Sequence, residues 1–335
     1  MRRGIAGFTL NNTIRPTRFF HTFGPHEPFL RVQPGSVLRL ECPDSDNMFA
    51  DGTLVPESHR SPTTGSAIFP GNPIAGPIHV EGAMPGDVLA VRIRVIHLTA
   101  THGQTLLKPG HGLLAMHELA PDSPDSIPTH MYRWRVDAAN GVSRLKNPLG
   151  SQPIEVALDP FLGCLGVCPK WGQSFSTLFA GSFGGNMDIP LLRPGATLFL
   201  PVEIEGALFG LGDIHAAQGH GEIIGGAIET AGEVEVQLDV IKNIRISSPR
   251  LRSPAVLAAI SSDGDLNKSI RNATSQLVQW LHDGFGLNRF DAYNVVSQAG
   301  SFVLGSLICG TPSVAACIEL EKLPKALQAS GGELQ

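Results

Sequence analysis

Short apolar stretches broken by glycine and proline dominate the first 240 residues of this 335-residue chain, which contains 38 Gly and 26 Pro. The clearest stretches are residues 36–41, 88–95, 197–202 and 234–240. They alternate or run apolar as strands do, and Pro-Gly pairs stand shortly before three of them, where type II turns are expected. This pattern predicts a mainly β fold built from units of sandwich or barrel type.

The pattern changes from about Ser253, where apolar residues take helical spacing. Helices are predicted over residues 253–260, 267–284 and 291–304, with Asn288 or Asp291 as the cap of the last one. The C-terminal portion is therefore expected to be α-helical or α/β. We divide the chain into a first, sandwich-like β domain (1–150), a second β unit (151–245) and this C-terminal portion (246–335).

Charge and composition exclude several classes of function. A net charge of -5 offers little to neutralise a phosphate backbone, which argues against nucleic-acid binding. No apolar stretch reaches the length of a membrane span, and residues 1–9 lack the apolar run of a signal peptide. Five cysteines without a CxxC pair suit a reducing compartment, with Cys164 and Cys168 expected to be buried small hydrophobes. These features predict a cytoplasmic protein with no membrane partner.

Residues that bind metals and move protons gather in two glycine-rich segments, 184–189 and 212–222. Asp213 and His215 stand two apart at the end of an apolar run, so on a strand both project from one face and can share one metal ion. Glu222 follows Gly-His-Gly, a backbone able to fold back toward them. It is the candidate general base.

These two segments resemble motifs of the acetamidase/formamidase family of amide hydrolases. Residues 184–189 match a GGN-hydrophobic-D-I stretch, and residues 212–222 match GD-x-H-AAQG-x-GE. Residues 76–89 resemble GP-x-x-VEGA-x-PGD-x-L, and residues 162–169 resemble an IG-x-x-GVAP turn. The resemblance runs from about residue 30 to residue 325.

The resemblance implies an amidase that hydrolyses a small linear amide, assembled as a homo-oligomer. It also implies that Asp188 joins Asp213 and His215 as a metal ligand, with Asn186 of the same motif as a catalytic residue. Because a histidine sits among the carboxylates, zinc is expected rather than calcium as the divalent ion.

Two further acids in the N-terminal half are assigned through the resemblance. Asp44 corresponds to the acid of a family E-T-x-D stretch and is expected to be a fourth metal ligand, with Cys42 departing from that pattern. Asp46 and Asn47 are expected in a local solvated turn. Glu81 lies in the VEGA match, where either a catalytic role or a backbone-tethering role is open. Together these residues predict a site built between the first and second β units.

The histidines of the first half of the chain, His79, His97, His102 and His111, do not have the spacing of metal ligands. His102 and His111 are expected in a glycine-rich loop over the pocket, and the role of His79 is open. His220 occupies a family position that is frequently acidic, which points to an altered substrate or an altered acid/base partner. Three functions stay open: a metal-assisted hydrolase of formamide-like or acetamide-like amides, a hydrolase of a different or larger C–N substrate, and a non-catalytic β-sandwich module holding a structural ion.

Overall fold

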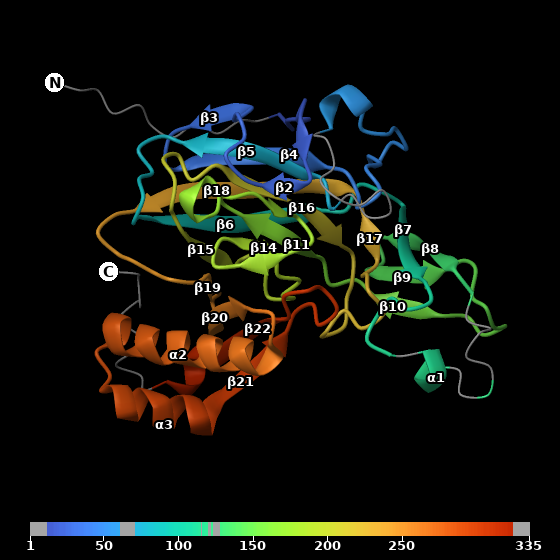
Figure 1. Ribbon diagram of the computed structural model, residues 1–335. Coiled ribbons are helices and arrows are strands. Elements are labelled where there is room, and N and C mark those ends of the chain that lie inside the picture. The colour runs from blue at the N-terminus through green and yellow to red at the C-terminus, as the bar shows by residue number, and fades with distance from the viewer. Residues whose placement is uncertain (1–11, 61–70, 115, 120–121, 123–127, 324–335) are drawn as a thin grey trace.

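Two β-sheets packed face to face form the body of the protein (Figure 1). The computed structural model describes residues 12–60, 71–114, 116–119, 122 and 128–323. Residues 1–9, for which the sequence predicts no signal peptide, lie outside these ranges. Apolar side chains from both sheets, such as Leu38 and Leu211, meet in one buried cluster. The predicted mainly β fold is confirmed.

The larger sheet has twelve strands among the described residues, in the order β10-β9-β8-β7-β17-β16-β11-β14-β13, with β5 beside β16 and with β1 and β3 beside β5. Its strands are β1 (Phe19–Phe20), β3 (Leu30–Val32), β5 (Ile74–Val80), β7 (His102–Leu107), β8 (His130–Asp137), β9 (Val142–Leu145), β10 (Glu155–Ala157), β11 (Phe161–Gly166), β13 (Ala180–Gly181), β14 (Gly184–Asn186), β16 (Phe209–His215) and β17 (Glu229–Thr230). Strands β7 to β10 form the end of this sheet that projects from the body (Figure 1).

The second sheet has the order β21-β22-β20-β19-β15-β6-β18-β4. Its strands are β4 (Ser36–Cys42), β6 (Val88–His97), β15 (Thr197–Pro201), β18 (Gly232–Ile241), β19 (Arg250–Arg252), β20 (Val256–Ser262), β21 (Gly300–Leu304) and β22 (Ser313–Glu319). A separate pair joins β2 (Thr22–Phe23) to β12 (Phe175–Ser176). The helices are α1 (Met116–Leu119), α2 (Leu266–Phe285) and α3 (Arg289–Ala299), with short 3₁₀ turns at Glu57–His59, Lys170–Gly172 and Leu320–Lys322.

The turns before three predicted strands have the expected backbone. Gly35, Gly86 and Gly195 precede β4, β6 and β15 with φ angles of 85°, 95° and 92°, which type II turns require at their third residue. The strands do not stay within the predicted segments. β4 and β6 come from residues 1–150, yet both pair with β18 of the 151–245 segment. β15, from that same middle segment, pairs with β19 of the C-terminal portion.

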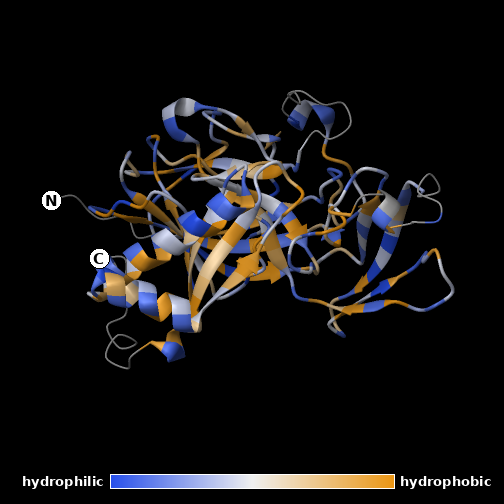
Figure 2. Ribbon diagram, turned by 60° about the horizontal axis from the view of Figure 1, so that its bottom comes forward, coloured by the Kyte–Doolittle hydropathy of each residue, from blue (hydrophilic) through white to orange (hydrophobic). Residues whose placement is uncertain are grey.

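The helices α2 and α3 cover the outer face of the second sheet (Figures 1 and 2). Trp280 of α2 is 1% exposed and meets Phe199 of β15 edge-on, with 6.2 Å between ring centroids. Leu277 and Leu281 of the same helix are also buried, so this face of α2 belongs to the core. Asn288 caps α3 by accepting a hydrogen bond from the backbone N–H of Phe290.

Two of the predicted helices are wrong in whole or in part. Residues 256–260, predicted as the end of a helix, lie in strand β20, and residues 300–304 form β21 instead of extending α3. In β20, Leu257 and Ala259 face the helices while Ala258 and Ile260 face the core between the sheets. A strand buried on both faces has a continuous apolar sequence, which periodicity does not distinguish from a buried helix.

Candidate active site

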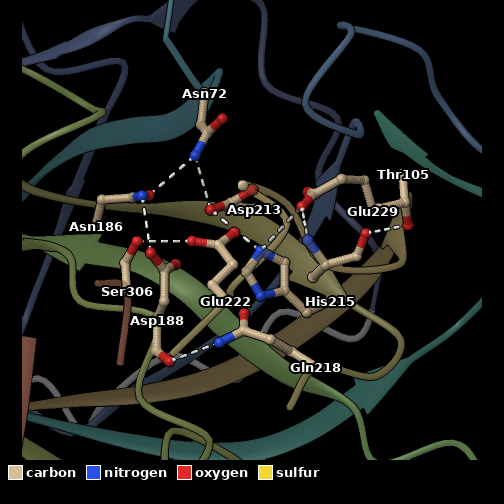
Figure 3. A network of polar contacts seen from close by, with 12 residues as sticks. Asn72, Thr105, Asn186, Asp188, Asp213, His215, Gln218, Glu222, Glu229 and Ser306 are labelled. Atoms are coloured by element: carbon tan, nitrogen blue, oxygen red, sulfur yellow. Dashed lines mark hydrogen bonds and ion pairs between the residues drawn. The ribbon is translucent and has the colours of Figure 1, made fainter. Parts of the chain in front are cut away.

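Asp213 and His215 lie at the end of β16 with their side chains on the same side, as the sequence predicts (Figure 3). Nε2 of His215 is 3.4 Å from Oδ2 of Asp213, and both side chains are at most 2% exposed. Phe161 of the neighbouring strand β11 packs edge-on against the imidazole. Both side chains therefore point to one place, and the aromatic contact holds the imidazole there.

Asp188 reaches the same point from the far side of β11. Strand β11 pairs with β14 on one edge and with β16 on the other, so Cys164 is opposite both Asn186 and Gly212. Ligand atoms of Asp188, Asp213 and His215 all lie within 4.8 Å of one another. A Cβ atom at Gly163, between them, would be 2.5 Å from Oδ2 of Asp213 and 2.6 Å from Oδ1 of Asp188. Glycine is therefore required here for the three side chains to converge.

Glu222 and Glu229 complete the cluster. Glu222 follows Gly221, whose φ of 93° turns the backbone toward the sheet, and its Oε2 accepts a 2.8 Å hydrogen bond from the Ser306 hydroxyl. Glu229 on β17 is directly opposite His215 in the ladder, with 3.5 Å between Oε1 and Nε2. The position of Glu222 agrees with the prediction. Glu229 was missed, because an acid in a short strand carries no motif.

Two amides hold the carboxylates in place. Nδ2 of Asn72 donates to Oδ2 of Asp213 at 2.7 Å and to Oδ1 of Asn186 at 2.9 Å. Nδ2 of Asn186 in turn donates to Oδ2 of Asp188 at 3.0 Å. The structure thus brings Asn186 into the site as a residue that links the two acids (Figure 3). Asn72, which precedes β5 in a part of the chain without a recognisable motif, was missed.

The backbone is strained at three of the acids. Asp188, Asp213 and Glu222 have φ angles of 50°, 62° and 50°. These lie in the left-handed region, which residues other than glycine rarely adopt. Such conformations cost of order 1–3 kcal/mol each and gather at functional sites. The fold therefore holds these carboxylates in directions that an ordinary strand or loop would not give them.

Burial and mutual repulsion shift the protonation of the cluster. Burial raises the pKa of Asp188 well above its usual value, and the nearby Glu222 carboxylate raises it further. Burial also raises the pKa values of Glu229 and Glu222, with His215 opposing the shift in both. For His215, burial acts to lower the pKa, but the carboxylates of Glu229 and Asp213 outweigh it and raise the value to about 10.

Several buried oxygen and nitrogen atoms of the cluster make no hydrogen bond. Among the described residues, Oδ1 of Asp188, Oε2 of Glu229 and both ring nitrogens of His215 are buried without one. Buried polar groups are normally satisfied, so each such atom needs an explanation. Carboxylate oxygens and imidazole nitrogens that converge without partners are a donor set suited to a divalent cation. The residues present therefore fit a metal ion.

The cluster opens into a cavity of about 740 Å³. Asp213, Glu222 and Glu229 line it, together with Asn72 and Asn186. Cys309 also lines it, with its sulfur 3.7 Å from Nδ2 of Asn186, and burial raises the pKa of this thiol to about 11. The buried acids are thus accessible to a small molecule.

Asp44 is placed differently from the prediction. It is 1% exposed and does not belong to any of the groups of described residues whose side chains could hold a metal ion together. Its Oδ1 accepts hydrogen bonds from the backbone N–H groups of Asp46 and Met48 at 3.0 and 2.8 Å. Asp44 holds its own turn together, because a carboxylate readily accepts from amides two and four residues ahead. Asn47 of this turn is buried rather than solvated, and Asp46 lines the cavity.

Glu81 is far from the cluster. The other end of β5, at Ile74, pairs with Gly212 beside Asp213, and Glu81 lies seven residues further on, roughly 20 Å along a strand. Its carboxylate is 41% exposed and lies 3.8 Å from Arg31 and 3.6 Å from His79. The expectation that Glu81 converges with the central motifs is wrong, because the strand between them is extended.

Some histidines and cysteines outside the cluster lie where the sequence predicts, and others do not. His111 lines the cavity, with Nε2 2.8 Å from the carbonyl oxygen of Gly225. His102 begins strand β7 instead of lying in a loop, and His220 is exposed. Cys164 and Cys168 are both buried, as predicted, although Cys164 lies in strand β11 and not in a turn.

Comparison with known proteins agrees with this arrangement. The sequence pattern of the acetamidase/formamidase family matches residues 20–172 and 173–321. The chain belongs to the acetamidase/formamidase family. A crystal structure of an acetamidase from Yersinia enterocolitica superposes with a TM-score of 0.79 at 28% identity, covering 96% of this chain and 95% of that one.

Curated members of the family match over part of their length. A candidate formamidase of Schizosaccharomyces pombe is 45% identical over 276 residues, and the match covers 70% of this chain and 66% of that protein. The acetamidase of Mycolicibacterium smegmatis is 28% identical over 265 residues, 63% of each protein. The chain thus spans just under two thirds of the length of these relatives. Among the described residues, no helix is long and apolar enough to cross a membrane.

Proposed function

We propose that the protein hydrolyses the C–N bond of a linear primary amide to a carboxylate and ammonia, assisted by a divalent metal ion. One observation carries the proposal: buried ligand atoms of Asp188 and His215 that make no hydrogen bond lie beside Glu222, and the cluster opens into a cavity. The names of the family relatives, formamidase and acetamidase, support the same chemistry.

The metal would be held by Asp188, Asp213 and His215, whose ligand atoms converge over Gly163. The histidine among the ligands favours zinc over calcium. When bound, such an ion polarises a carbonyl oxygen and lowers the pKa of water. It would also offset the burial and the mutual repulsion that raise the pKa values of Asp188 and Glu229.

The remaining steps belong to the side chains. An ionised Glu222 accepts a proton from the attacking water and, once protonated, donates it to the departing nitrogen. The Ser306 hydroxyl orients the Glu222 carboxylate, and Asn72 and Asn186 fix Asp213 and Asp188.

The accessibility of the acids argues against a non-catalytic structural-ion module. Structural metal sites are closed by protein ligands, whereas Asp213, Glu222 and Glu229 all line the open cavity. A larger C–N substrate stays compatible with the site.

The test is ammonia release from formamide and acetamide by protein of known metal content. Removal of metal with a chelator should abolish release, and stoichiometric zinc should restore it. Undiminished activity in demonstrably metal-free protein would contradict the metal-assisted mechanism. Absence of ammonia release from every amide by the metal-loaded protein would contradict amide hydrolysis.

A further inference from the structure

The cavity extends well beyond the acidic cluster. Its volume of about 740 Å³ lies within the range of pockets that enclose ligands of tens of atoms, roughly 300–1,000 Å³. Formamide and acetamide have only a few non-hydrogen atoms and would fill a small part of it. The walls away from the cluster therefore show what else a substrate contacts.

One wall is the β7–β8 hairpin. Gln104 of β7 is directly opposite Glu229 of the cluster, and Leu106 is the next residue of β7 on the same face, opposite Met131 of β8. Both Leu106 and Met131 line the cavity and are half-buried. Two residues along a strand span roughly 7 Å. An apolar surface thus begins a short distance from the acids.

Apolar side chains also lie on the segments that complete the cavity. Leu178 and Phe179 follow β12, and Ile308 lies in the loop between β21 and β22. The Phe179 side chain remains 41% exposed. Apolar surface left open beside a catalytic cluster gains free energy when an apolar ligand covers it.

The acidic end sets the orientation of an amide. Glu222 and Glu229 line that end beside the proposed metal ligand Asp213, and their carboxylates accept hydrogen bonds when ionised. A primary amide has two N–H donors on nitrogen, so its NH₂ group faces the carboxylates. Its acyl substituent then points away from them, along Leu106 and Met131.

We propose that the substrate is a primary amide with an apolar acyl chain several carbons long, which contacts the apolar residues that line the cavity: Leu106, Met131, Leu178, Phe179 and Ile308. This inference rests on the proposed amide hydrolysis. The chains of butanamide and hexanamide extend further from the amide carbon than the methyl group of acetamide, toward the Leu106–Met131 pair.

The test is a series of kcat/KM values for formamide, acetamide, butanamide and hexanamide, measured as ammonia release. Each added methylene that is buried should raise kcat/KM about fourfold, so hexanamide should exceed butanamide by about 16-fold. A flat or falling series, with acetamide turned over, would overturn this inference and leave amide hydrolysis standing. Ammonia release from none of the four would overturn both.

Two variants test where the acyl chain of the substrate binds. Met131→Ser should lower the ratio of hexanamide to acetamide kcat/KM about fivefold, because it removes apolar contact surface from the hairpin wall. Met84→Ser is the matched control, since Met84 is 46% exposed and does not line the cavity. Equal ratios in the wild type and both variants would place the chain elsewhere and overturn the assignment. Faster hydrolysis of N-butylacetamide than of hexanamide would overturn the proposed orientation.

Discussion

Ser306 and Glu222 are 84 residues apart in sequence, yet the Ser306 hydroxyl donates a 2.8 Å hydrogen bond to Oε2 of Glu222. Ser306 is fully buried and Glu222 is 7% exposed. The loop between β21 and β22 thus fixes the carboxylate that the central motif supplies. This contact joins the C-terminal portion of the chain to the chemistry of the site.

The proposed base gives the first prediction. Glu222→Gln keeps the size of the side chain and an oxygen that accepts from Ser306, but it removes the proton acceptor. We expect kcat to fall by roughly 10²–10⁴-fold, the usual contribution of general acid–base catalysis, with metal content unchanged. Steady-state ammonia release together with metal analysis checks this. A Gln variant with close to the wild-type rate would show that Glu222 is not the base.

Metal content tests the proposed ligands. Asp213→Ala and His215→Ala should each lose the ion and the activity together, because each removes one of three converging donors. Glu81→Gln is the control, since Glu81 is a partly exposed acid outside the cavity, and it should keep both. Elemental analysis of purified protein decides. Full occupancy in both ligand variants would rule these residues out.

Gly163 tests the convergence of the ligands. In Gly163→Ala the new methyl group would collide with Asp213 and Asp188, so we expect zinc affinity to fall by roughly 10–100-fold, as when the groups supporting metal ligands are altered. Gly166→Ala, on the same strand, would instead meet backbone atoms of Phe183 and Gly185. It should lower Tm while the folded protein keeps its zinc affinity. Competition with a fluorescent chelator measures the affinity, and equal zinc affinity in Gly163→Ala and wild type would contradict the prediction.

Asp44 gives a pH prediction. Burial raises its pKa from 3.8 to about 6, so between these values the folded state binds more protons than the unfolded state. The free energy of unfolding therefore falls as pH rises through this window, by up to ~1.4 kcal/mol per pH unit. Asp44→Asn keeps an oxygen for the amides of Asp46 and Met48 but does not titrate. Its urea-unfolding free energy should fall less steeply from pH 4 to pH 6, and identical slopes would refute the assignment.

The amino-acid sequence was sufficient to predict local features of the structure. Pro-Gly turns before β4 and β6, the cap at Asn288 and the pairing of Asp213 with His215 on one strand face depend on neighbouring residues and on strand alternation. The motif around Asn186 and Asp188 pointed to the same site through its family resemblance. The helix predicted over residues 253–260 failed because an apolar run fits either a buried strand or a buried helix.

By itself, the sequence determined the mainly β class, the C-terminal helix α2 and the central acids, because periodicity and short motifs are properties of adjacent residues. Only the tertiary structure decided which distant groups join them. It brought Asn72, Glu229 and Ser306 to the site and left Glu81 at the opposite end of β5. Strand pairing and loop closure bring together residues far apart in sequence, and no local pattern records those contacts.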